Sequence, residues 1–265
     1  MTLFVEQEMT GIHISSLGSY KARDLEFLRD HPDLTSVLVS EGGGIDLSGL
    51  AYLTKLKHLT LDNYDSPIPL REFGQLETFA GEWSKELQLG PDCARLTSLS
   101  LRRYKAKDLP QFPCLPALSS LELVQASIES LEGIQTHVQI EKLTFHRCSK
   151  LASIDAIAGL ADGSLQQLSF ERCPKIKNIE ILGRLRRVKT INLQYCPDLR
   201  SLDFLKGCQQ LEGFGFFGTK LPDGDLTPLL SLPKLSFIGM SDKRHFSHTK
   251  DELNQLLSAR CSGDS

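Results

Sequence analysis

The sequence lacks any long uninterrupted apolar stretch, although 40% of its 265 residues are hydrophobic. No window approaches the roughly eighteen consecutive apolar residues that a membrane-spanning helix needs, so we expect no membrane span. The first residues also lack a basic region followed by an apolar run, so we expect no secretory signal and a cytoplasmic location. Export without a recognisable N-terminal signal stays open as the alternative.

The chain also lacks a strong charge of either sign. Its formal net charge is −3 and its pI is about 6.2, which gives no electrostatic reason to expect a nucleic acid or an anionic membrane as partner. The seven cysteines include no Cys-x-x-Cys pair, which favours reduced thiols over a disulfide framework. No spacing of histidine, serine and cysteine matches a catalytic triad, so we expect no enzymatic activity and no cofactor.

In place of these features the sequence has a repeated pattern of apolar residues. Residues 165–173, LQQLSFERC, carry large apolar side chains at the first, fourth and sixth places and a cysteine at the ninth. Further copies begin at Val188, Leu211 and Leu235, at intervals of 23, 23 and 24 residues. Earlier copies begin at Leu34, Leu56, Leu76, Leu96, Leu118 and Ile140, and a weak one begins at Met9. A period of this size indicates a stack of similar units.

The pattern resembles the leucine-rich repeat, L-x-x-L-x-L-x-x-N/C-x-L. This resemblance implies an α/β solenoid, a curved horseshoe with a concave parallel β-sheet and short helical turns or loops on the convex side. The fourth and sixth places are two residues apart, so their side chains point to one face of a strand and into the core. The fifth and seventh places then point to solvent.

The other half of each copy also follows a pattern. Asp24, Asp46, Asp155 and Asp225 each lie ten residues before the next first place, where an aspartate can accept backbone N–H bonds at the start of a short helical turn. Residues 45–56, IDLSGLAYLTKL, resemble the repeats of bacterial internalins. The resemblance covers about residues 9 to 242 and indicates a fold, but it does not by itself name a function.

We expect two parts along the chain. Residues 1–248 form the solenoid, with an N-terminal cap over residues 2–17, and residues 249–265 form a C-terminal capping helix and a frayed tail. Thr249 and Glu252 fit a capping box, and Leu253, Leu256 and Leu257 lie on one face of the predicted helix. We expect the protein to be a monomer.

Three cysteines recur at the ninth place of consecutive copies, Cys148, Cys173 and Cys196. Stacked strands would bring their thiols to roughly 4.8 Å spacing, which permits a metal or redox interpretation. The favoured alternative is a ladder of small side chains that bond the backbone, because stacking alone supplies no tetrahedral set of ligands. The pair His245 and His248 lacks a third ligand in the same motif, so we expect no metal there.

The residues at and after the seventh place form the candidate binding surface. Tryptophan, tyrosine and arginine dominate interface energetics, and the only tryptophan of the chain lies on this column. Gly213, Gly215 and Gly239 leave backbone bare beside two phenylalanines, which predicts an apolar recess. The predicted protein-binding residues are Trp83, Arg102, Arg103, His146, Arg147, Glu171, Arg172, Tyr195, Phe217 and Phe237. The alternative is that the arginines are only solvated and that the C-terminal segment covers Phe217 and Phe237.

These observations predict a non-enzymatic scaffold that binds a protein partner through its concave face. A rigid, preorganised sheet loses little entropy on binding. One form of this prediction is a bacterial immunity or inhibitor-type protein that neutralises one protein inside the cell. The alternative is an exported effector or adhesin that binds a host protein.

Overall fold

In the computed structural model the described residues are 10–15, 23–40, 44–62, 64, 68–84, 87–110 and 112–262. The chain divides into two compact units: Met1–Arg102 with Pro113–Leu118 (the first unit), and Arg103–Phe112 with Ser119–Ser265 (the second unit). Most of the predicted N-terminal cap, including Met9, lies outside the described residues.

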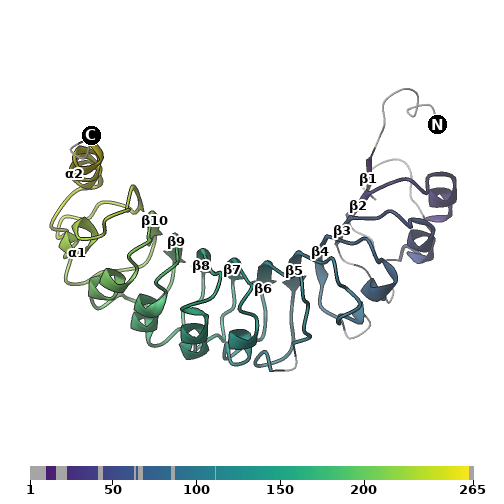
Figure 1. The fold of residues 1–265 in the computed structure, drawn as a ribbon, viewed down its shortest axis with the longest axis horizontal. Helices are drawn as coiled ribbons and strands as arrows, with labels where there is room; N and C mark the ends of the chain where they lie inside the picture. Colours follow the sequence, from purple (N-terminus) through teal and green to yellow (C-terminus); the bar gives the residue numbers. More distant parts are fainter. Residues whose placement is uncertain are drawn as a thin grey trace. The chain divides into compact units, whose positions relative to one another are not determined.

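The first unit is a parallel sheet whose strands pair in chain order (Figure 1). Its strands are β1 (Gly11–Ser15), β2 (Ser36–Ser40), β3 (His58–Leu61), β4 (Thr78–Glu82) and β5 (Ser98–Arg102). Short 3-10 turns lie between them, namely η1 (Glu26–Asp30), η2 (Ser48–Tyr52) and η3 (Leu70–Glu72).

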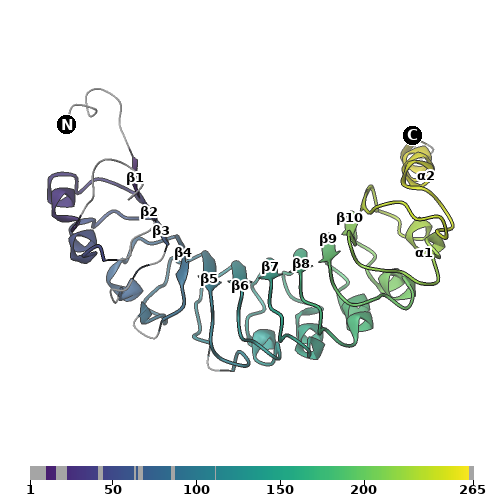
Figure 2. The same ribbon diagram turned by 180° about the vertical axis from the view of Figure 1, so that it is seen from behind.

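The second unit repeats this arrangement, and Figure 2 shows its turns on the side away from its strands. Its strands are β6 (Ser120–Val124), β7 (Lys142–His146), β8 (Gln167–Glu171), β9 (Thr190–Gln194), β10 (Gly213–Gly215) and β11 (Phe237–Gly239), all parallel and paired in chain order. Its helical turns are η5 (Ile134–Thr136), η6 (Asp155–Leu160), η7 (Ile179–Arg184), η8 (Asp203–Gly207) and α1 (Thr227–Leu230), and it ends with helix α2 (Lys250–Ser262).

The core consists of the first, fourth and sixth places, as the repeat predicts. In β8 Leu168 and Phe170 are 1% and 0% exposed, and the register pairs them with Ile191 and Leu193 of β9. The ring of Phe170 stacks on that of Phe145 in β7, with centroids 5.2 Å apart and planes at 13°. Open parallel sheets joined by short turns confirm the predicted solenoid architecture.

The aspartates of the return segments act largely as expected. Asp46 Oδ1 accepts the backbone N–H of Ser48 at 2.9 Å, and Asp225 Oδ1 accepts that of Thr227 at 2.9 Å. The backbone hydrogen bond from Ser48 lowers the pKa of Asp46, because it stabilises the charged carboxylate. Asp155 differs: its Oδ1 accepts a hydrogen bond from the side-chain amide of Asn178.

Two glycines allow consecutive return turns to approach each other. A Cβ added to Gly207 would overlap the carbonyl oxygen of Gly183, and one added to Gly183 would overlap that of Phe204. Any larger residue would therefore force the backbone of η7 and η8 apart.

Helix α2 begins with the predicted capping box. The backbone N–H of Thr249 donates to Glu252 Oε2 at 2.7 Å, and the N–H of Glu252 donates to Thr249 Oγ1 at 3.3 Å. Leu253 and Leu257 are buried, whereas Leu256, predicted on the same face, is 45% exposed. Within the described ranges, no helix has both the length and the apolar character needed to cross a membrane.

One buried histidine lacks a partner for its ring. His137 is 3% exposed and packs edge-on against Phe112, with ring centroids 5.7 Å apart. Its Nε2 atom has no hydrogen-bond partner among the described residues. Burial lowers the pKa of His137, because the charged imidazolium would lose its hydration.

The second unit should therefore lose stability in mild acid. The unfolded state, with a histidine pKa of about 6.5, binds a proton before the folded state does. The free energy of unfolding should be constant above that pH and decrease as the pH falls below it. Urea unfolding at neutral pH and at about pH 5.5 measures this, and His137→Phe should reduce the dependence. An equally steep dependence in His137→Phe would contradict the assignment.

Candidate protein-binding surface

The strands of the second unit end in turns that share one backbone conformation. The eighth-place residues Arg103, Gln125, Arg147, Arg172 and Tyr195 have φ values of 57°, 52°, 53°, 54° and 50°, and Gly218 follows with 72°. Side chains rarely adopt this left-handed conformation, which costs roughly 1–2 kcal/mol. Tertiary hydrogen bonds hold it: the N–H of Arg147 donates to the carbonyl of Glu171, and that of Arg172 to Gln194, both at 2.8 Å.

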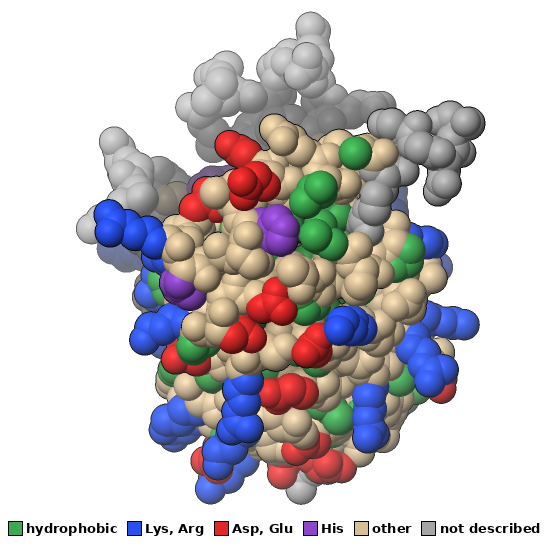
Figure 3. All heavy atoms as spheres, turned by 90° about the vertical axis from the view of Figure 1, so that its left-hand side faces the viewer, with side chains coloured by type: hydrophobic (Ala, Val, Ile, Leu, Met, Phe, Trp, Pro, Cys, Tyr) green, Lys and Arg blue, Asp and Glu red, His purple; other side chains and the backbone are tan. Residues whose placement is uncertain are grey.

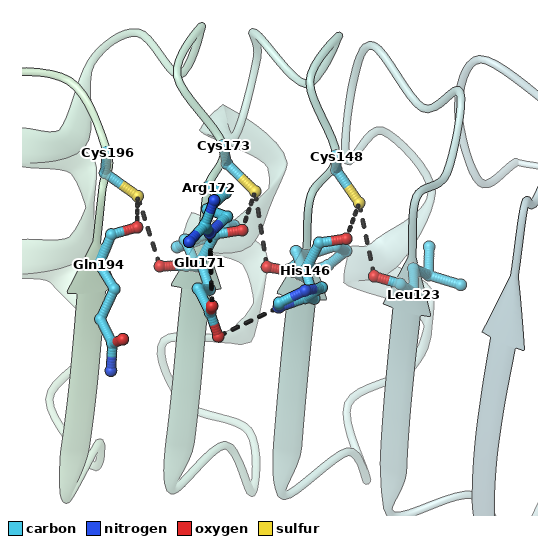
Figure 4. A network of polar contacts seen from close by, with 10 residues as sticks. Leu123, His146, Cys148, Glu171, Arg172, Cys173, Gln194 and Cys196 are labelled. Atoms are coloured by element: carbon cyan, nitrogen blue, oxygen red, sulfur yellow. Dashed lines mark hydrogen bonds and ion pairs between the residues drawn. The ribbon is translucent and has the colours of Figure 1, made fainter.

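The ninth-place cysteines bond the backbone of the preceding repeat, as the favoured interpretation expects (Figure 4). The thiols of Cys148, Cys173 and Cys196 donate to the carbonyls of Leu123, Phe145 and Phe170 at 3.4, 3.5 and 3.4 Å. The ladder continues in the next repeat, where Thr219 Oγ1 donates to the carbonyl of Leu193 at 2.7 Å. Thr219 was not predicted, although it occupies the ninth place of the copy that begins at Leu211.

The three thiols of this ladder differ in acidity: a hydrogen bond with the Cys173 thiol lowers the pKa of Cys148, whereas the pKa values of the other two are raised. The adjacent Cys148 thiol and burial raise the pKa of Cys173, and burial raises that of Cys196 to about 11. Cys173 and Cys196 therefore resist ionisation, which makes them poor nucleophiles and poor metal ligands at neutral pH. Over the described part of the chain, no three His, Cys, Asp or Glu side chains converge on a common point, and His245 Nε2 lies 3.0 Å from the carbonyl oxygen of Leu221.

A line of contacts crosses the ends of β7 to β10. His146 Nδ1 lies 3.0 Å from Glu171 Oε2, and Glu171 Oε1 lies 3.9 Å from Arg172 Nε (Figure 4). The guanidinium of Arg172 lies 5.0 Å from the ring centroid of Tyr195. The Tyr195 ring meets the Phe217 ring edge-on at 5.9 Å. Such exposed contacts add little stability, but they orient the side chains before any partner arrives.

The predicted apolar recess is present on the exposed face of the sheet. A hollow of about 490 Å³ lies over Gly213, Gly215 and Gly239, with Phe217 and Phe237 among its walls. Phe217 is 46% exposed and Phe237 is 62% exposed. The C-terminal segment therefore does not cover them, contrary to the alternative interpretation.

A second hollow, of about 690 Å³, lies at the edge where the strands end. Tyr195, Phe216, Phe217 and Phe246 line it, together with Lys220, Lys243 and His245. Its aromatic and cationic lining was missed from sequence, because Lys243 to Phe246 lie beyond the last repeat. Figure 3, a view onto the left-hand side of Figure 1, shows a cluster of hydrophobic side chains beside a histidine and other hydrophobic side chains scattered among charged ones.

The predicted site residues divide between the two units. Trp83 and Arg102 belong to the first unit, where the Arg102 guanidinium forms an ion pair with Asp62 and donates to the carbonyl of Leu61 at 3.1 Å. Contacts within its own unit thus hold the Arg102 side chain. Arg103 opens the column of the second unit. The remaining residues lie on consecutive repeats of the second unit: His146, Arg147, Glu171, Arg172, Tyr195, Phe217 and Phe237.

The repeats match a known family. Residues 122–239 fit the model described as BspA type leucine rich repeat region, in six copies. Residues 122–239 of this chain are therefore leucine-rich repeats. No curated protein sequence matches it.

Solved structures share the fold of this chain at low sequence identity. A leucine-rich-repeat protein of Leptospira interrogans aligns with a TM-score of 0.65 at 16% identity, over 89% of this chain and 61% of that one. An internalin, InlF, of Listeria monocytogenes aligns with 0.57 at 16%, over 86% and 76%. The functional domain of InlJ from the same species, described as including a cysteine ladder, aligns with 0.55 at 17%, over 94% and 52%.

Proposed function

We propose that this leucine-rich-repeat protein is a non-enzymatic scaffold that binds one protein partner through the exposed sheet face and adjoining turns of its second unit. The observation that carries the proposal is the group of Tyr195, Phe217 and Phe237, which are 43%, 46% and 62% exposed. Large apolar side chains exposed next to one another are typical of interaction sites. Aromatic residues and arginine are also the types enriched at interface centres.

The backbone of the eighth places supports the same surface. Gly218 occupies the left-handed conformation without strain, yet the four preceding repeats place Gln125, Arg147, Arg172 and Tyr195 there. Strained backbone of this kind clusters at functional sites, where the role of the side chain outweighs the conformational cost. Long side chains at these positions therefore favour a role in binding over a role in folding.

Within this class we propose an immunity or inhibitor-type protein that acts inside a bacterial cell on one target protein. The moderate net charge of −3 fits recognition of a protein better than of a polyanion. An exported effector or adhesin would use the same surface against a host protein. Capture from bacterial lysate and from host-cell lysate, run in parallel, separates these two roles.

The left-handed column offers variants that remove side chains without harming the fold. In Arg147→Gly with Arg172→Gly, glycine relieves strain at φ 53° and 54°, so the free energy of unfolding should stay within about 1 kcal/mol of wild type. Loss of two interface arginines should nevertheless reduce retention of the partner by about tenfold or more. Quantitative mass spectrometry of captured proteins, beside urea unfolding, measures both effects.

The matched control is Arg186→Gly with Arg187→Gly, which removes the same two charges from exposed positions that line a hollow before the strand that starts at Thr190. It should retain the partner like wild type. A partner held equally by both double variants would contradict the assignment of the surface. Retention of no protein by wild type from either lysate would count against the scaffold function itself.

A further inference from the structure

The ring of Phe217 separates two hollows of the second unit. On the sheet side it borders the hollow of about 490 Å³ over the glycines of β10 and β11. On the turn side it borders the hollow of about 690 Å³ against Phe246. Both volumes lie in the range of roughly 300–1,000 Å³ typical of binding pockets. Phe217 is therefore a ridge with an apolar depression on either side.

The charges around this ridge have one sign. Of the described residues with charged side chains, Lys250 alone lines the first hollow, and Lys220, Lys243 and the titratable His245 line the second. Among the residues that the structure describes, no acidic side chain lines either hollow. The carboxylate of Asp242 accepts the backbone N–H of Lys250 at 2.7 Å.

We propose that the partner segment docking over Phe217 carries a large apolar side chain flanked by carboxylates. This inference rests on the proposed protein-binding function and specifies the chemistry of its partner. The apolar side chain fills the recess over the bare glycines, and the carboxylates meet the ammonium groups of Lys220, Lys243 and Lys250. Charge complementarity of this kind sets the orientation of a partner and speeds its association.

Other hollows do not combine these features. A hollow of about 770 Å³ between the segments 176–180 and 197–204 carries Lys177, Glu180, Asp198 and Arg200, so its charges are mixed. The hollow of about 600 Å³ is lined by Arg186, Arg187 and Lys189 but also by Glu141, and none of its described lining residues is aromatic. Only the surroundings of Phe217, among these four hollows, join exposed rings to a lining whose described charged residues are all basic.

Selection of short random peptides displayed on phage tests the proposal with the full chain as bait. The library is first depleted on Phe217→Ala with Phe237→Ala, whose exposed side chains are not needed for folding. We expect the retained peptides to combine a large apolar residue with neighbouring Asp or Glu. Their affinity is then measured by titration against wild type and three variants.

The variants test the charge of the rim and the shape of the recess separately. Lys220→Glu with Lys243→Glu should weaken the peptides about tenfold or more, because it reverses the charge of the rim. Gly213→Leu should weaken them similarly by filling the recess, and it fits the fold because the nearest atoms to an added Cβ lie at 3.6 to 3.9 Å, ordinary contact distances. Lys189→Glu, an exposed lysine that lines a different hollow, should have no effect.

Each of the other outcomes overturns a defined part of the proposal. Basic or uncharged peptides that still respond to Gly213→Leu overturn the acidic partner and leave protein binding at this surface intact. Peptides insensitive to Gly213→Leu, or none at all, overturn docking over Phe217, while the capture experiment with Arg147 and Arg172 judges the scaffold function separately. Binding of an aromatic sulfonate dye without any enriched peptide would assign the hollows to a small molecule and overturn the proposal.

Discussion

Phe170→Ala should lower the free energy of unfolding by about 3–5 kcal/mol. The side chain is 0% exposed and stacks on Phe145, which is equally buried, at 5.2 Å. Deleting the ring leaves a cavity between neighbouring repeats, and a stack held in register on both sides collapses only partly around it. Urea unfolding followed by circular dichroism measures the loss as a lower midpoint.

The same substitution on the other face of the sheet is the matched control. Phe237 is 62% exposed, so Phe237→Ala should change the free energy of unfolding by no more than about 0.5 kcal/mol. Equal losses in the two variants would show that Phe237 also packs into the core, and they would remove it from the binding surface.

Gly207→Val should lower the free energy of unfolding by about 3 kcal/mol, nearly as much as Phe170→Ala. The reason is that the new side chain would press on backbone and not on a flexible side chain. Its Cβ would overlap the carbonyl oxygen of Gly183 in the preceding turn. Relief requires separation of η7 from η8, which also strains the pairing of the strands that these turns connect. The midpoint of urea unfolding again provides the measurement.

Gly74→Ala is the comparison for that substitution. No atom lies within 4 Å of a Cβ added to Gly74, and the reduced freedom of the unfolded chain should leave stability unchanged or raise it by up to about 1 kcal/mol. If Gly207→Val proved as mild as Gly74→Ala, the close approach of the return turns would have no energetic consequence.

The architecture was predictable from sequence because burial acts on single side chains at fixed places. Leu168 and Phe170 follow the repeat and are buried, and the capping box at Thr249 is formed as the spacing of Thr249 and Glu252 predicts. The return turns were predicted as short helical elements, but the pairing of Asp155 with Asn178 was not. That contact depends on the distance between neighbouring repeats, which no single repeat encodes.

The candidate site was predictable only where it follows the repeat. The recess beside Phe217 and Phe237 was expected from three glycines, and the structure has it. The second hollow was not predicted, because Lys243 and Phe246 come from an irregular segment that folds back against the last repeats. The engagement of Arg102 by Asp62 was also missed, since it depends on two side chains 40 residues apart.

The left-handed turns have a consequence for engineering. Arginine, glutamine, tyrosine and glycine each occupy an eighth place in the left-handed conformation. These positions should therefore tolerate different side chains without a change of the backbone. Successive strands lie about 4.8 Å apart, which makes positions two repeats apart nearly independent, whereas neighbours such as Arg172 and Tyr195 are in contact and couple. A library that randomises alternate repeats first would therefore let affinity gains be combined by simple addition of free energies.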